Sequence, residues 1–209
     1  LKYHAIEIAD HQREAHPSGV TSLSSLPEGD LHGVVLANEL LDNLPFRLAV
    51  FDGTWREAFV ADTSSGAEEL LSAPFDPCPP ILPAQAVHGA RAPLIDEAAS
   101  WVKGVAERLN GTLVAFDYFT QTTSGLVERP WREWLRTYRS HERGGHYLMS
   151  PGEQDITTEV PIDQLPEPST VRSQSQWLDL HVLSELVEEG RRECEKNAAR
   201  PDVRALKML

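Results

Sequence analysis

One stretch of the chain restricts its fold more than any other. In "LHGVVLANELLDNLPF", residues 31–46, an aliphatic run of strand character ends abruptly in Asn38, Glu39 and Asp42. Runs of this length, bounded by residues that favour turns, are typical of buried strands. The polar residues leave two interpretations open. They form either a helix cap followed by a solvated turn, or the floor of a functional site.

The segments around this run alternate between strand-like and helix-like patterns. A short helix capped by Asn38 and ended by Pro45 would follow the run itself, and Asn110-Gly111 is expected to end a longer helix. Such alternation predicts an α/β fold with a mainly parallel sheet and helices on its faces. The other expected elements are buried strands at 3–9 and 112–118, a strand at 19–26, and helices at 94–109 and 174–199.

A hairpin interrupts this alternation. The runs at 47–51 and 54–61 flank Asp52-Gly53, a dipeptide typical of the tight turn between two antiparallel strands. Residues 72–93 contain six prolines and are expected to form a loop. We therefore expect an inserted hairpin at about 47–61, followed by an irregular segment.

The charge balance excludes some classes of partner. Nineteen Lys and Arg residues against 32 Asp and Glu residues give a net charge of −13, whereas binding to nucleic acid or to an anionic membrane requires a basic face. No apolar stretch is long enough to span a bilayer. Cys78 and Cys194 have neither zinc-site nor disulfide-framework spacing, so we expect packing roles and a cytoplasmic location.

Residues 128–147 concentrate arginines and aromatic residues in an otherwise acidic chain. The favoured interpretation is an amphipathic turn or helix in which Trp131, Trp134, Leu135 and Tyr138 face the core while the arginines pair with carboxylates. The alternative is an exposed binding surface.

Polar residues lie within or at the end of three of the expected strands. Glu7 lies in the first strand, Asn38 and Glu39 end the third, and Asp117 and Tyr118 end the last. Ligands of open α/β sheets bind beyond the carboxyl ends of the strands, where an acidic residue can accept both hydroxyls of a ribose. A single such carboxylate is more often a cap or a surface charge. Three at one expected edge favour a nucleoside-type site.

Other catalytic classes lack their sequence motifs. The chain contains no G-x-S-x-G, H-E-x-x-H, C-x-x-C or P-loop pattern. The spacing of His141, His146, Glu153 and Asp155 matches no closed metal site, so we expect no metal.

Four segments together resemble the MidA family of S-adenosylmethionine-dependent methyltransferases: "YHAIEIA", "GVVLANELLDNLPF", "GTLVAFDY" and "LRTYRSHERGGHYLMSPGEQDIT". Mitochondrial members of that family are complex I assembly methyltransferases that modify a protein arginine. The resemblance runs from about residue 3 to about 190. It implies a Rossmann-like class I fold in one partial domain, residues 1–209, with the hairpin at 47–61 and a substrate-side insertion at about 119–160. The family's first strand with its glycine-rich turn, and its last strands, are missing from this sequence.

The resemblance also assigns residues to roles. Glu7 is implied as the acid that binds the ribose of S-adenosylmethionine, and Asn38 and Glu39 as residues lining the junction of cofactor and substrate. Asp42 completes the signature turn. Phe119 replaces a glycine that is usual in the family. The remaining signature positions are expected to bind substrate: Asp117, Tyr118, Arg139, His141, Gln154 and Asp155.

Three functional hypotheses follow. The first is protein arginine methylation, in which Glu39 and Asp42 act as catalytic carboxylates that hold a guanidinium and accept its proton. The second is a non-catalytic assembly or interaction protein on the same fold, and the third is methylation of a small molecule. A protein substrate is expected, nucleic acid and membrane are not, and a homodimer is left open.

Overall fold

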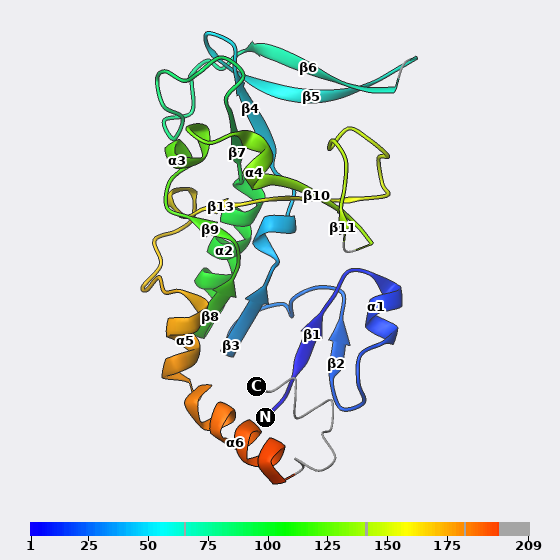
Figure 1. Ribbon diagram of the computed structural model, residues 1–209, viewed down its shortest axis with the longest axis vertical. Helices are drawn as coiled ribbons and strands as arrows, with labels where there is room; N and C mark the ends of the chain where they lie inside the picture. The colour runs from blue at the N-terminus through cyan, green and yellow to red at the C-terminus, as the bar shows by residue number, and fades with distance from the viewer. Residues whose placement is uncertain (65, 141, 182, 197–209) are drawn as a thin grey trace. The chain divides into compact units, whose positions relative to one another are not determined.

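The aliphatic run of the sequence forms strand β3 (Leu31–Asn38) in the computed structural model, which describes residues 1–64, 66–140, 142–181 and 183–196 (Figure 1). Strand β3 pairs in parallel with β8 (Leu109–Phe116), and Gly33 lies opposite Gly111. A Cβ atom on Gly111 would overlap the carbonyl oxygen of Gly33, so glycine is required at this close approach. The preceding helix ends at Arg108, close to the predicted position, but Asn110 and Gly111 lie inside β8 rather than in a turn.

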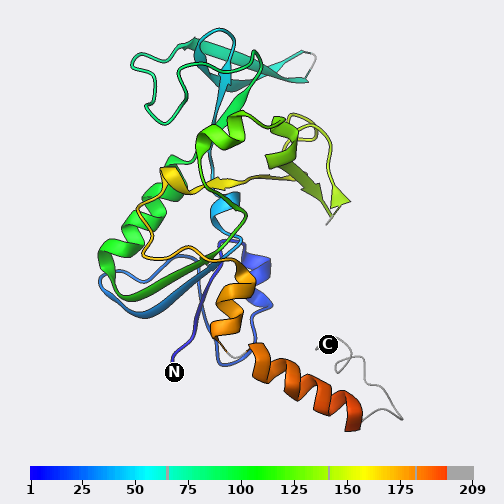
Figure 2. The same cartoon turned by 60° about the vertical axis from the view of Figure 1, so that its left-hand side comes forward.

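Strand β3 is buried on one face only. Val34 and Leu36 are 73% and 58% exposed, whereas the alternate residue Ala37 is buried. Successive side chains of a strand point to opposite faces, and helix α2 (Asp96–Arg108) covers one face of the β3–β8 pair (Figure 2). The strand predicted at this run is therefore confirmed, but its burial is limited to one face, and the helix expected at 94–109 is confirmed.

The turn after β3 differs from the expected helix. Asn38 is the last strand residue rather than an N-cap, and only the 3₁₀ turn η1 (Leu41–Asn43) follows. The carboxylate of Asp117 accepts hydrogen bonds from the backbone N–H groups of Leu41 (2.9 Å) and Asp42 (3.4 Å). The first amides of the turn are thus satisfied by a side chain from beyond β8.

The N-terminal segment forms a small parallel pair. Strand β1 (His4–Ile6) pairs with β2 (Thr21–Leu23), and helix α1 (Asp10–Glu14) lies between them in the chain. Both expected strands are present but short. Ile8, expected to be buried, is 85% exposed, because the strand ends at Ile6 and Ile8 has no strand partner.

The largest sheet is antiparallel and has the order β6-β5-β4-β7. The hairpin predicted around Asp52-Gly53 is confirmed, since Phe51 pairs with Trp55. Strands β6 and β7 lie in segments without a strand prediction, with β7 at the end of the expected loop, and β5 extends beyond the predicted run. The strands are β4 (Arg47–Phe51), β5 (Trp55–Thr63), β6 (Gly66–Pro74) and β7 (Arg91–Leu94).

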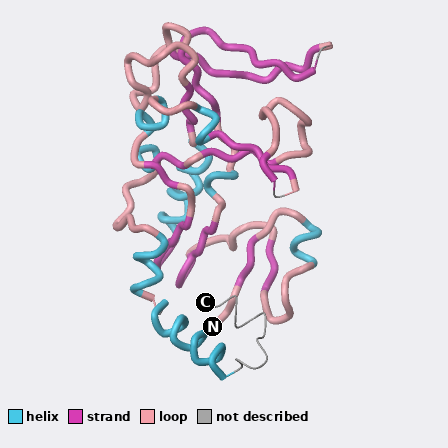
Figure 3. The backbone as a smooth tube through the Cα atoms, in the orientation of Figure 1, coloured by secondary structure: helices cyan, strands magenta, loops and turns pink. Residues whose placement is uncertain are grey.

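The mixed α/β class is confirmed, but one mainly parallel sheet is not. Figure 3 shows the helices and strands along the backbone. Among the described residues, parallel pairing is confined to β1–β2, β3–β8 and β9–β13. A three-stranded antiparallel sheet has the order β11-β10-β12. The elements of this region are β9 (Phe119–Thr120), α3 (Thr123–Val127), α4 (Trp131–Trp134), β10 (Leu135–Arg139), β11 (Glu142–Arg143), β12 (Asp155–Thr158), β13 (Val160–Pro161) and η2 (Ile162–Gln164).

The arginine- and tryptophan-rich segment belongs largely to the core. Trp134 is fully buried, and its indole N–H donates to the carbonyl of Leu126 at 3.0 Å. Arg129 and Arg136 both pair with Glu159. The core interpretation is therefore confirmed for Trp134 and Leu135, whereas Trp131 and Tyr138 are only half-buried. The segment is one helical turn followed by a strand rather than a continuous helix.

The chain divides into two compact units, residues 1–166 and 167–209. The described part of the second unit contains α5 (Gln174–Leu180) and α6 (Leu183–Lys196). Ser173 and Gln176 form a capping box at the start of α5, and the backbone leaves the helical region at His181. The single helix expected at 174–199 is therefore two helices. None of the helices in the described ranges combines the length and apolar character needed to cross a membrane.

Candidate functional site

A hollow of about 540 Å³ opens beyond the carboxyl ends of β3 and β8. The turn after β3 forms one side, Tyr118 follows β8, and β10 and β12 with their flanking residues form the facing wall. We call it the acidic hollow. Its lining residues are Glu39, Asp42, Asn43, Tyr118, Trp134, Arg136, Tyr138, Ser140, Asp155, Thr157, Thr158 and Glu159.

Carboxylates dominate the charge of this lining. Glu39, Asp42, Asp155 and Glu159 contribute four acidic groups, and Arg136 contributes one guanidinium. That guanidinium is already paired with Glu159 at 3.1 Å. A concave surface with this excess of negative charge attracts cationic ligands.

Asp42 has the most perturbed carboxyl group of the hollow. The residue is only 4% exposed, and the amide of Asn43 donates to its Oδ1 at 2.8 Å. Burial raises the pKa of Asp42 to about 6, and the nearby carboxylates of Asp117 and Glu39 add to the increase. Asp42 can therefore exchange a proton near neutral pH.

Glu39 is held in a strained conformation beside it. Its φ of 49° lies in the left-handed region, which a residue with a side chain rarely adopts. Its N–H donates to the carbonyl of Phe116 at 2.8 Å, so the pairing of β3 and β8 extends to this residue. The hydroxyl of Tyr118 lies 3.5 Å from the Glu39 carboxylate, and that carboxylate raises the pKa of Tyr118.

The structure brings together four of the residues that the sequence singled out. Glu39, Asp42, Tyr118 and Asp155 all line the acidic hollow. Asp117 lies behind it, where its carboxylate caps the η1 turn and accepts from the Tyr118 N–H at 2.9 Å.

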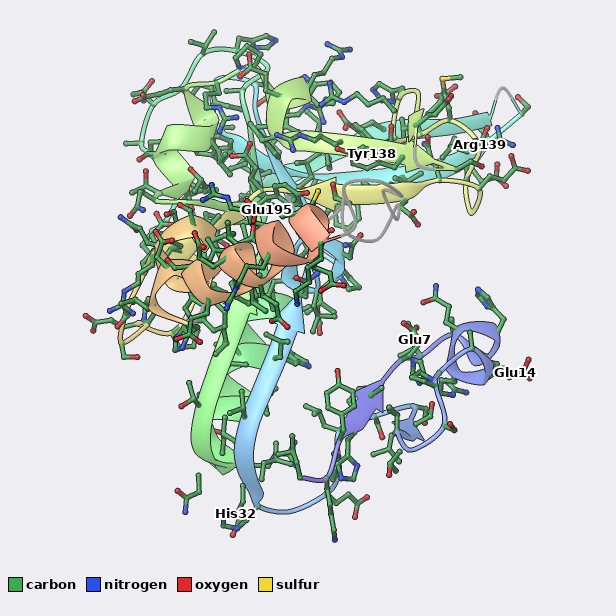
Figure 4. All side chains as sticks on the ribbon, turned by 60° about the horizontal axis from the view of Figure 1, so that its bottom comes forward. Glu7, Glu14, His32, Tyr138, Arg139 and Glu195 are labelled. Atoms are coloured by element: carbon green, nitrogen blue, oxygen red, sulfur yellow. The ribbon has the colours of Figure 1, made fainter. Side chains whose placement is uncertain are left out.

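The other predicted site residues lie outside the lining. Glu7 has a local role, since its Oε1 accepts from the Ala9 N–H at 2.8 Å. Asn38 is exposed at the end of β3. Arg139 pairs with Glu153 at 2.8 Å. Figure 4 labels Arg139 beside Tyr138 on β10, and Glu7 on the N-terminal segment.

Two signature residues from the last motif remain. Gln154 donates from its amide to the carbonyls of His146 (2.9 Å) and Met149 (2.7 Å), which ties the loop before β12 together. His141 lies outside the described residues. Over the described ranges, no group of three His, Cys, Asp or Glu side chains has the arrangement of a metal site.

Of the wall that β10 and β12 provide, the sequence predicted Asp155 as a site residue and missed the rest. Arg136 lies opposite Thr157 and Tyr138 opposite Asp155, so these four residues share one face of the sheet. The guanidinium of Arg136 also lies 5.9 Å from the ring centre of Tyr118. Alternation in "LRTYR" was the available signal, but the tryptophan spacing favoured a helix there.

Residues 2–179 match the sequence profile of a family described as "Putative S-adenosyl-L-methionine-dependent methyltransferase". The chain belongs to this family. The family's description names S-adenosylmethionine, which is the cofactor that the sequence predicted. No curated protein is a significant match to the chain.

Two solved structures from Burkholderia thailandensis are similar to this methyltransferase-family chain. An uncharacterized protein shares 25% identity and a TM-score of 0.67 over 78% of this chain and 48% of its own. A second, described as a "likely methyl transferase" and bound to S-adenosyl-homocysteine, shares 24% identity and a TM-score of 0.67 over 78% of this chain and 46% of its own. The chain thus spans about half the length of these proteins.

The described carboxylates have the chemistry that the family's cofactor requires. Glu39 and Asp42 provide negative charge that suits a sulfonium cation. In Glu7, Oε1 accepts a backbone hydrogen bond, while Oε2 has no partner within the described chain and so retains its capacity for a hydroxyl donor.

Proposed function

We propose that this chain forms the acceptor-binding part of an S-adenosylmethionine-dependent methyltransferase that modifies arginine side chains of a protein. The carboxylate excess of the acidic hollow is the observation that carries this proposal. A guanidinium keeps its charge at any physiological pH and binds carboxylates through paired hydrogen bonds. Membership of the methyltransferase family and the MidA resemblance both support it.

Glu39 and Asp42 have different roles toward the acceptor. Glu39, at the open side of the turn, holds the guanidinium and orients one nitrogen for reaction. Methylation of a guanidinium that remains charged releases one proton, and Asp42, with a pKa of about 6, is the group that accepts it. S-adenosylmethionine supplies the methyl group from a sulfonium centre.

The cofactor side of the proposal involves Glu7 and Asn38. Glu7 would bind ribose hydroxyls through its unpartnered Oε2, and Asn38 would line the junction with the acceptor. The three parallel strand pairs are compatible with a Rossmann-like arrangement of this region. Arg139, Gln154 and the exposed carboxylates near them would contact the flanking residues of a protein substrate.

Transfer of a labelled methyl group tests the proposal. The chain, joined at its N-terminus to the family's glycine-rich strand and turn, is incubated with labelled S-adenosylmethionine and with peptides that contain arginine, lysine or citrulline, or with free arginine. We expect label in the arginine peptide alone. Glu39→Gln removes a charged hydrogen-bond partner and should lower kcat/KM by about tenfold to a hundredfold. The control Glu128→Gln, at an exposed position that ends α3, should match the wild type.

Three outcomes would count against the proposal. Absence of label from every acceptor would leave the non-catalytic interaction protein as the better hypothesis. If Glu39→Gln loses cofactor affinity and methyl transfer to the same extent, Glu39 serves only to bind the cofactor. Label in free arginine but not in the peptide would indicate a small-molecule acceptor instead.

A further inference from the structure

Three polar side chains from distant parts of the chain meet outside the acidic hollow. Glu69 of β6 accepts two hydrogen bonds from the guanidinium of Arg91 on β7, at 2.5 Å and 2.8 Å. The hydroxyl of Tyr147, in the loop between β11 and β12, donates to the same carboxylate and accepts from Arg91 at 2.9 Å. These three residues form the Glu69–Arg91–Tyr147 cluster.

Aromatic rings enclose the guanidinium of this cluster. Arg91 lies 4.8 Å from the ring centre of Trp131 and 5.8 Å from that of Tyr147. The ring of His146 stacks on Tyr147 at 4.3 Å and meets Trp131 edge-on at 5.7 Å. Such contacts stabilise a desolvated cation.

The charges of the cluster depend on one another. Burial alone would raise the pKa of Glu69, but hydrogen bonds from Arg91 and Tyr147 outweigh it and lower that pKa. Burial, followed by the hydrogen bond to Glu69, raises the pKa of Tyr147 to about 12, so its hydroxyl remains a donor. The Nε of Arg91 is buried without a partner in the described chain. Within the cluster, the Glu69 carboxylate balances the positive charge of the Arg91 guanidinium.

The loop that carries Tyr147 is hydrogen-bonded to β10 and to the residue that directly precedes β12. The N–H of Gly144 donates to the carbonyl of Thr137 at 2.8 Å, and the Thr137 hydroxyl donates to the carbonyl of Gly145 at 2.6 Å. Gln154 donates to the carbonyls of His146 and Met149. Thr137 separates Arg136 from Tyr138 on β10, and Gln154 directly precedes Asp155 on β12.

We propose that Glu69, Arg91 and Tyr147 are positioning residues for the acidic hollow. They anchor the loop at residues 144–149 to the antiparallel sheet, and the loop in turn fixes the strands that present Arg136, Tyr138 and Asp155. The kinetic consequence of this arrangement rests on the proposed methyl transfer, whereas the structural consequence does not.

Tyr147→Phe tests this proposal with little change in shape, because it removes the hydroxyl and keeps the ring over Arg91. Hydrogen exchange should be about tenfold faster at the Gly144 amide and at the amides of β10 and β12, and unchanged in β4 and β5. The KM for the arginine peptide should rise by roughly threefold to tenfold, with kcat within about twofold of the wild type. Glu69→Gln should act in the same direction. Tyr3→Phe, at an exposed position, is the matched control.

Unchanged exchange in β10 and β12 would overturn the proposal. So would faster exchange throughout the chain, which would indicate a role in global stability alone, or an unchanged KM in an active enzyme. If the wild type transfers no methyl group to any acceptor, the proposed function fails. In that case, the hydrogen-exchange rates of the β10 and β12 amides alone test the positioning role.

Discussion

Replacement of Asp42 by asparagine should stabilise the protein at neutral pH while impairing its function. The carboxyl of Asp42 is buried in the acidic hollow, and burial raises its pKa from 3.8 to about 6. A shift of this size corresponds to about 3 kcal/mol of folding free energy. Asparagine has nearly the same shape, and its carbonyl can still accept the hydrogen bond from Asn43.

The direction of the pH dependence follows from the raised pKa. The folded protein binds the proton of Asp42 more tightly than the unfolded chain does, so this contribution to stability is fully present below about pH 4. It is lost as the pH rises through 6. At pH 7, Asp42→Asn should therefore be more stable than the wild type by up to about 3 kcal/mol, and the two should converge at low pH.

Urea unfolding of both proteins between pH 4 and pH 8 measures this difference. Asp62→Asn, at an exposed position on β5, controls for the general effect of removing a negative charge. Parallel pH profiles for the wild type and Asp42→Asn would refute the reasoning. They would mean that the Asp42 carboxyl is not desolvated in the folded protein.

Two further predictions concern the strand pair and the cofactor. Gly111→Ala should destabilise the protein by at least about 2 kcal/mol in thermal or urea unfolding, because the new methyl group meets the Gly33 carbonyl. Gly104→Ala, in open space on α2, should instead stabilise it by about 0.4–1 kcal/mol. A change in stability of the same sign in both variants would contradict the close approach of Gly111 to Gly33. In the chain joined at its N-terminus to the family's glycine-rich strand and turn, Glu7→Ala should weaken S-adenosylmethionine binding in calorimetry by about 1–3 kcal/mol. An unchanged affinity would remove Glu7 from the cofactor site.

Elements with strong local patterns could be predicted from the sequence. The run at β3, the Asp52-Gly53 hairpin and helix α2 are all defined by residues within a short window. Strand β7 was missed because prolines precede and interrupt it. It is an edge strand, where the missing N–H of Pro93 is tolerated.

Long-range contacts explain the other failures. The turn after β3 is capped by Asp117, which lies 76 positions from Leu41, so the local N-cap pattern at Asn38 was misleading. The spacing of Trp131, Trp134 and Tyr138 fits a helix, but the chain extends into β10 after a single turn. For the same reason the candidate site was predicted on the side of β3 and β8, whereas on the side of β10 and β12 only Asp155 was predicted.

Binding of an arginine peptide tests the central claim most directly, because it requires neither cofactor nor turnover. Calorimetry should detect binding of the arginine peptide but not of the otherwise identical citrulline peptide, whose side chain is neutral. The affinity should fall as salt is added and should be weakened by Glu39→Gln combined with Asp42→Asn. Equal binding of the two peptides, or full affinity in the double variant, would contradict a cation-binding role for the acidic hollow.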